Sequence, residues 1–214
     1  MSLIPLFPLG QVLFPGAELP IRVFEPRYRA LVRHCVLHQE PFGVVAVRQG
    51  SELDPAPLSF RVGTLARIGE VSRLPGGESE VLARGETRFR LVALAAGAAY
   101  PQAEVEPLPD LPPAWYADTA LDQLRPVYEA YRRGLVAMGL DLPAFHELPK
   151  EPTELSWAVA QNLVVELESR QLILEERRPL ERLRRELSLL RREATLVERG
   201  LANRVVRSPS YTPN

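Results

Sequence analysis

The stretch PLFPLGQVLFPGAELPIRVFEPRYRALV, residues 5–32, carries the strongest structural signals in the chain. Prolines and glycines interrupt its apolar residues every few positions, which excludes a membrane-spanning helix and the apolar core of a signal peptide. The alternation ELPIRV at 18–23 predicts a strand with one buried face. Pro26 suits a first helical turn, and apolar residues then recur at helical spacing up to His38, which predicts a helix.

Strand signals continue through the rest of the first half. The run FGVVAV at 42–47 predicts a buried strand, and several short strands follow between residues 60 and 94. The tripeptide at 75–77, Pro-Gly-Gly, interrupts them with two glycines that can adopt the positive φ of a tight hairpin. We therefore expect a β-meander or small barrel over residues 1–108, followed by the proline-rich segment PLPDLPPA at 107–114.

The second half of the chain has the apolar spacing of helices. A stripe from Leu121 to Met138 predicts one helix, which Pro126 should kink or shorten. A second helix is expected to begin at an N-cap, Thr153. Residues 155–167 are apolar on nearly every side, so we expect this helix to lie at the centre of a bundle.

The third predicted helix, residues 179–201, carries a heptad seam. The seam consists of Leu180, Leu183, Leu187, Leu190, Ala194, Val197 and Leu201. Charged residues cover the other faces, as in a solvated helix. We favour packing of the seam on the chain's own helices, with a homodimer formed through 179–201 as the alternative.

These patterns predict an α+β fold, a mostly antiparallel barrel with one helix followed by an α-helical bundle. We expect the barrel at 1–108, a proline-rich linker at 109–114, the bundle at 115–205 and a disordered tail at 206–214.

Composition excludes several functions. The formal net charge of −1 over 214 residues gives no global attraction to nucleic acid or anionic lipid. Cys35 is the only cysteine, so no internal disulfide is possible and a reducing, cytoplasmic location is expected. Lys150, the only lysine, stands in LPKEP, without the glycines of a phosphate-binding loop, and a serine-lysine dyad would depend on it alone. We expect no ATPase or peptidase chemistry, no cofactor and no membrane partner.

Two histidines are candidate metal ligands. His34 and His38 lie four residues apart, which places both imidazoles on one face of the predicted helix. A third ligand would have to come from elsewhere, and His146 is the only other histidine. We favour a pair of ordinary helix-end histidines without metal. Cys35 beside His34 points in a different direction from it, which favours a buried thiol over a nucleophile.

Arginines recur along the predicted strand RGETRFR at 84–90. Arg84, Arg88 and Arg90 would form an anion-binding patch if they shared one sheet face. Cross-strand pairing with neighbouring glutamates is the favoured interpretation.

The apolar first segment is the most distinctive candidate for a binding surface. Eight large apolar residues, Phe7 and Phe14 among them, fall between residues 3 and 14. Prolines prevent a full ladder of strand hydrogen bonds. We therefore expect this segment to run along a sheet edge, with part of its aromatic surface open to a partner.

Three blocks of the chain resemble the amino-terminal substrate-binding domain of the ATP-dependent protease Lon, in a stand-alone form. The blocks are residues 5–32, then GTLARIGEVSRLPGGESEVLARGETRFRLV at 63–92, and SWAVAQNLVVELESRQLILE at 156–175. The resemblance implies a six-stranded, PUA-like pseudobarrel followed by a helical bundle. The chain ends before the ATPase and serine-lysine peptidase modules of the full protease could begin, so the expected function is recognition without catalysis.

The resemblance implies binding of unfolded or extended polypeptide segments, within a protease or chaperone system. The expected contact residues are Phe7, Pro8, Phe14, Pro15, Arg27 and Tyr28. A structural role is favoured for most motif positions: Gly16 in a turn, Phe24 in the core, and Glu25 paired with Arg27 or Arg29. The alternatives are a PUA-like nucleic-acid-binding protein and a self-associating structural or regulatory protein.

Overall fold

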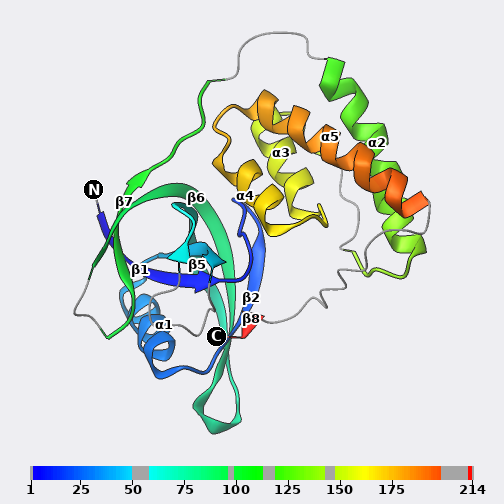
Figure 1. Ribbon diagram of the computed structural model, residues 1–214. Helices are drawn as coiled ribbons and strands as arrows, with labels where there is room; N and C mark the ends of the chain where they lie inside the picture. Colours follow the sequence, from blue (N-terminus) through cyan, green and yellow to red (C-terminus); the bar gives the residue numbers. More distant parts are fainter. Residues whose placement is uncertain are drawn as a thin grey trace. The chain divides into compact units, whose positions relative to one another are not determined.

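The computed structural model describes residues 2–49, 58–95, 99–112, 119–142, 148–198 and 212–213. The chain forms two compact units, Met1–Pro109 with Ser208–Asn214, and Asp110–Arg207. The first unit is mostly β-structure and the second is helical, so the fold is α+β (Figure 1). The two units divide inside the proline-rich segment 107–114.

The first unit contains one helix and a continuous sheet. Its elements are β1 (Ser2–Leu9), β2 (Glu18–Val23), α1 (Pro26–His38), β3 (Phe42–Gln49), β4 (Leu58–Ser59), β5 (Val62–Arg73), a 3₁₀ turn (Pro75–Gly77), β6 (Ser79–Ala95), β7 (Gln102–Pro107) and β8 (Thr212–Pro213). The strand predicted at 18–23 and the helix predicted at 26–38 are confirmed. The predicted hairpin is confirmed as well, because Gly76 and Gly77 have φ of +80° and +79°. The rest of the tail at 206–214 lies outside the described residues.

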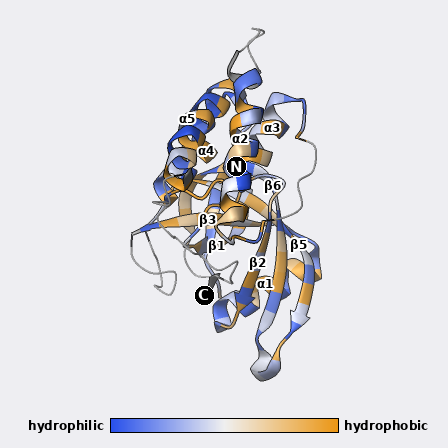
Figure 2. Ribbon diagram, turned by 90° about the vertical axis from the view of Figure 1, so that its right-hand side faces the viewer, coloured by the Kyte–Doolittle hydropathy of each residue, from blue (hydrophilic) through white to orange (hydrophobic). Residues whose placement is uncertain are grey.

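Five strands close a ring. β1 pairs in parallel with β3 and antiparallel with β7, β7 pairs with β6, β6 with β5, and β5 with β3. β2 adds to β6 outside this ring, which gives the six main strands of the expected pseudobarrel. Hydrophobic and hydrophilic residues alternate along β2, as its sequence predicts (Figure 2).

The first strand has a divided pairing that accommodates its prolines. Residues 2–5 of β1 pair with β7, whereas residues 6–9 pair with β3. Pro5 and Pro8 therefore each lie where the described ladder has a partner on one side only. A proline removes one backbone donor, and a strand paired on one side tolerates that loss.

In the barrel interior, the aromatic ring of Phe89 lies against two glycines, Gly43 and Gly63. Its buried side chains are Ile4, Leu6, Val45, Phe89, Ala103 and Val105. A Cβ atom on Gly43 would lie 2.7 Å from Ile4 Cδ1 and 2.8 Å from the ring of Phe89. A Cβ on Gly63 would collide with the backbone oxygen of Val44 and lie 2.7 Å from Phe89. A side chain is therefore excluded at Gly43 by Ile4 and the Phe89 ring, and at Gly63 by the Val44 backbone as well as by that ring.

A second core lies where α1 packs on the sheet. Tyr28, Leu31, Val32 and Cys35 of α1 are buried there with residues of β1, β2, β3, β5 and β6. Phe7 stacks on Tyr28 with 4.4 Å between ring centroids. The apolar stripe predicted on this helix is confirmed except for Val36, which is half exposed.

The second unit contains α2 (Thr119–Ala137), α3 (Pro152–Gln161), α4 (Leu167–Glu175) and α5 (Pro179–Glu198). Helix α2 continues through Pro126, so the expected shortening does not occur. Leu183, Leu187 and Leu190 of α5 are buried in a bundle in which α5 packs on α2 and α3. The favoured interpretation of the heptad seam, packing on the chain's own helices, is confirmed for these three leucines.

The central helix predicted over 155–167 is wrong, because α3 ends at Gln161 and α4 begins at Leu167. Side chains bind the backbone groups at this break. Arg170 Nη1 donates to Leu163 O at 2.7 Å, and Val164 N–H donates to the Tyr131 hydroxyl at 3.1 Å. Apolar periodicity does not reveal such bonds, since their donors and acceptors come from other helices.

The N-cap of α3 also differs from the prediction. It is Glu151, whose carboxylate accepts a hydrogen bond from the N–H of Thr153 at 2.8 Å. A carboxylate at this position satisfies a free N–H and complements the positive end of the helix dipole.

We predict that Gly63→Ala lowers the free energy of unfolding by about 1–3 kcal/mol, because the added methyl group overpacks the barrel. Gly69→Ala, on the same strand, is the control, because its Cβ would meet only Leu82 O at 3.5 Å. Urea unfolding followed by circular dichroism measures both values. Equal stabilities of the two variants would contradict the close packing around Gly63 described here.

Candidate functional site

The aromatic residues expected to bind a polypeptide are in the core. Phe7, Phe14 and Tyr28 have no exposed surface. The expectation of open aromatic surface on the first segment is therefore wrong for these three residues. Side chains of the barrel interior cover one face of β1. Helix α1 and its neighbouring strands cover the other face, so this half-paired strand still has two buried faces.

The remaining expected contact residues have structural roles or partial exposure. Pro8 is buried and Pro15 is half-buried. Arg27 Nε lies 2.8 Å from Glu25 Oε2, and its guanidinium lies 4.6 Å from the centroid of the Tyr28 ring. This ion pair joins the residue before α1 to its first turn, as the pairing of Glu25 with Arg27 predicts.

The two helix histidines lie side by side on α1. The ring centroids of His34 and His38 are 4.6 Å apart, and His34 Nε2 lies 3.1 Å from Glu40 Oε2. Across the described ranges, no three histidine, cysteine, aspartate or glutamate side chains are arranged to hold a metal. His146 lies outside these ranges.

Cys35 does not have the properties of a nucleophile. Its side chain is buried, and burial, with a smaller contribution from Glu40, raises the pKa of the thiol to about 11. Reactive cysteines instead have a lowered thiol pKa, because the thiolate is the nucleophile. The buried thiol favoured from the sequence is confirmed.

The arginines of β6 do not form a common patch. Arg88 is buried, whereas Arg90 is exposed and lies 3.4 Å from Glu106 on β7. Arg84 is exposed and faces Glu18 in the register of β2 and β6. The favoured cross-strand pairing is confirmed for Arg90. The three arginines do not form an anion-binding patch, because Arg88, between the other two, is buried.

Exposed apolar side chains lie elsewhere. Of the seven large exposed apolar residues in the described ranges, five belong to the first unit and two to the second: Leu3, Val36, Leu37, Val71 and Leu94, then Val136 and Leu172. Leu37 on α1 is the most exposed of them, at 73%. The sequence pattern does not predict the exposure of Leu37, because an apolar residue at a helix end looks the same in the sequence whether or not another element covers it.

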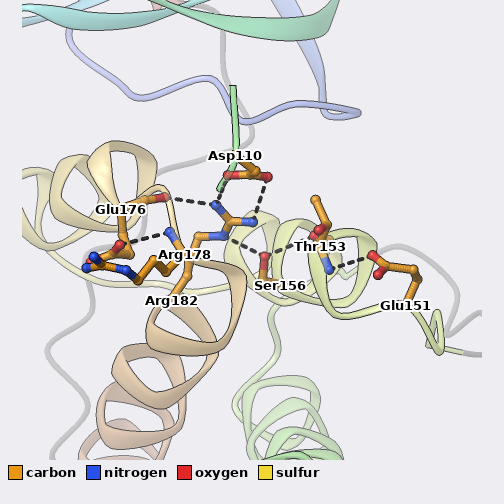
Figure 3. Close-up of polar contacts among 7 residues, drawn as sticks. All are labelled: Asp110, Glu151, Thr153, Ser156, Glu176, Arg178 and Arg182. Carbon is orange, nitrogen blue, oxygen red and sulfur yellow. Dashed lines mark hydrogen bonds and ion pairs between the residues drawn. The ribbon is translucent and has the colours of Figure 1, made fainter. Parts of the chain in front are cut away.

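The second unit contains a buried arginine cluster (Figure 3). Arg182 of α5 has no exposed surface, and its guanidinium lies 3.5 Å from the centroid of the Trp157 ring. Two of its nitrogens contact the carboxylate of Asp110 at 2.9 and 3.2 Å, and Nε donates to Ser156 Oγ at 2.6 Å. Nη1 also donates to Glu176 O at 2.9 Å.

This cluster holds the first residue of the helical unit against its helices. Asp110 begins that unit, while Ser156 and Arg182 lie on α3 and α5. A bidentate pair with a guanidinium fixes the position of the carboxylate as well as its charge. Sequence patterns do not indicate this buried arginine cluster, because charges beside a leucine seam are normally solvated.

Glu186 lies one turn after Arg182 and is completely buried. Neither carboxyl oxygen has a hydrogen-bond partner among the residues that the structure describes. Burial raises the pKa of this carboxyl well above its usual range, and the positive charge of Arg182 opposes the shift only in part. The side chain therefore keeps its proton at pH values where exposed glutamates are ionised.

In the part of the chain that is described, no helix has the length and apolar character needed to cross a membrane.

Comparison with known proteins identifies one family. The family described as the ATP-dependent protease La (LON) substrate-binding domain matches residues 3–192. A Lon protease of Roseiflexus castenholzii is 32% identical over 186 residues, which cover 81% of this chain and 22% of that protein. A Lon protease of Anaeromyxobacter dehalogenans is 27% identical over 180 residues, which cover 81% of this chain and 21% of that protein. The chain thus spans about a fifth of the length of the curated relatives it matches.

Solved structures share the fold. A Lon N-terminal domain protein from Xanthomonas campestris has a TM-score of 0.65 and 28% identity, covering 88% of this chain and 98% of that one. The N-terminal domain of the Mycobacterium avium complex Lon protease has a TM-score of 0.61 and 19% identity, covering 89% and 98%. The second likeness supports the fold alone.

We predict that Asp110→Ala lowers the free energy of unfolding by about 3 kcal/mol or more, because it leaves Arg182 buried without its counter-ion. Glu181→Ala is the control, since Glu181 makes an exposed ion pair with Arg184 on the same helix and should cost less than about 1 kcal/mol. Both values come from urea unfolding. A loss for Asp110→Ala no larger than the control would show that the buried pair does not stabilise the unit.

We predict that Glu186→Gln makes the protein less sensitive to alkaline conditions. The folded state holds a proton that the unfolded state releases near pH 4.5, so wild-type stability falls as pH rises towards the raised pKa. Glutamine does not titrate, and the stability of the variant relative to wild type should increase between about pH 5 and about pH 8. Urea unfolding across this pH range measures the free energy of unfolding of both proteins. A difference between them that does not vary with pH would contradict the prediction.

Proposed function

Because the chain belongs to the family of the ATP-dependent protease La (LON) substrate-binding domain, we propose that it binds unfolded or extended polypeptides without catalysing their cleavage. The match over residues 3–192 carries this proposal, since it includes both compact units. We place this function in a proteolytic system, in which the chain supplies recognition. Its partner there is a protease or chaperone, and its single cysteine favours the cytoplasm.

The properties of the candidate catalytic groups support a binding role. The thiol of Cys35 is buried and has a raised pKa, and His34 is engaged with Glu40. Lys150, the only lysine in the sequence, is the only residue available for a lysine-dependent peptidase or phosphate-binding site, and it has no glycine neighbours.

We assign the contact surface to the first unit, because five of the seven large exposed apolar side chains among the described residues lie there. Val36 and Leu37 on α1 form an adjacent apolar pair, which we term the α1 pair. Burial of such side chains against a polypeptide is favourable by about 25 cal/mol per Å². Ordering of a disordered partner opposes it, so we expect single-site dissociation constants on the order of micromolar.

The test is binding of a permanently unfolded protein, fluorescently labelled reduced and carboxymethylated α-lactalbumin, followed by anisotropy. Wild type should bind it, and native α-lactalbumin should not compete. Replacement of the α1 pair by serine should weaken binding by about threefold or more, since two exposed apolar groups are lost.

Leu172→Ser provides a matched control, because Leu172 is half exposed on α4 of the second unit. This variant should bind as wild type does. Absence of wild-type binding would refute the proposed function, and an equal effect of the two variants would refute the assignment to the first unit.

A further inference from the structure

Strand β2 has one fully paired edge and one nearly open edge. It pairs with β6 through every residue from Glu18 to Val23. On its other side, the described part of the chain contributes only β8, where Ile21 pairs with Thr212 and Arg22 with Pro213. An open strand edge presents unpaired backbone donors and acceptors and can accept an additional strand.

Pro20 indicates which backbone groups face this outer edge. Successive residues of a strand direct their N–H and C=O groups to alternate sides. Proline has no N–H, and within a sheet its nitrogen points away from the hydrogen-bonded neighbour. We therefore assign the backbone groups of Pro20 and Arg22 to the outer edge, which matches the position of β8 beside Ile21 and Arg22.

The side chains around this edge are poorly suited to selecting a sequence. Leu19, Ile21 and Val23 are buried in the first unit. Arg22 is engaged in an ion pair with Glu78, at 2.6 Å. A segment added here would be held mainly by its main chain, which suits recognition of unfolded polypeptides with many different sequences.

We propose that the outer edge of β2 binds one extended polypeptide segment by parallel strand addition, and that the chain's own Thr212–Pro213 occupies this edge as an internal competitor. The parallel seating of β8 identifies both the occupant and its direction. This inference rests on the proposed function, for which it supplies a binding edge. Pro20 confines the interaction to the end of β2 nearest α1, because it offers no donor.

The first experiment removes the competitor. Deletion of residues 206–214 should tighten binding of reduced, carboxymethylated α-lactalbumin by about threefold or more, because a tethered segment competes at a high effective concentration. The amide of Arg22 should also lose protection from hydrogen exchange. Unchanged affinity and unchanged exchange would overturn the competition by β8.

The second experiment removes one backbone donor. In the tail-deleted protein, Arg22→Pro should weaken binding of the same probe by about threefold or more, while Arg22→Ala should leave it nearly unchanged, because both lose the ion pair with Glu78 and only proline loses the N–H. Circular dichroism verifies that both variants fold. Equal binding by the two folded variants would refute strand addition at the outer edge of β2, but it would not contradict the proposed function.

A peptide experiment does not depend on any β2 variant. A synthetic peptide of residues 206–214 should bind the tail-deleted protein, and the same peptide N-methylated at Thr212 should bind at least about threefold more weakly. Equal binding of the two peptides would contradict main-chain recognition. Failure of both wild type and tail-deleted protein to bind the unfolded probe would instead refute the proposed function.

Discussion

The divided pairing of the first strand is the constraint on which the first unit depends. Residues 2–5 of β1 pair with β7 and residues 6–9 pair with β3, so the strand joins two neighbours although prolines deny it a complete ladder on either side. This stagger closes the ring of strands. Closure in turn creates an interior that Phe89 fills over Gly43 and Gly63, and it orients Phe7 towards Tyr28 of α1.

That arrangement determines where function can reside. Aromatic side chains in the first segment appear in the sequence as a possible contact surface, but the ring and α1 bury them on both faces. The contact surfaces that we propose are instead the α1 pair and the outer backbone edge of β2. Both would suit weak and sequence-tolerant contacts.

The helical unit depends on polar groups to a greater degree than its leucine seam indicates. Arg182 joins Asp110 to α3 and α5 and stacks on Trp157, whereas Glu186 remains buried without a partner among the described residues. A buried ion pair costs desolvation energy, and its main contribution is to fix geometry. Here the fixed element is the start of the unit, which lies inside the proline-rich segment 107–114.

Local patterns in the sequence were enough to determine the elements whose cause is local: the alternating strand at 18–23, the helix begun by Pro26, and the hairpin whose two glycines adopt positive φ. The motif residues at 5–32 also identified the family, and with it the α+β architecture. Tertiary structure alone decided the burial of Phe14, the break between α3 and α4, and the exposure of Leu37. The physical reason is that burial and helix ends depend on which distant groups cover a side chain or satisfy a backbone donor, and periodicity along one segment contains no information about those groups.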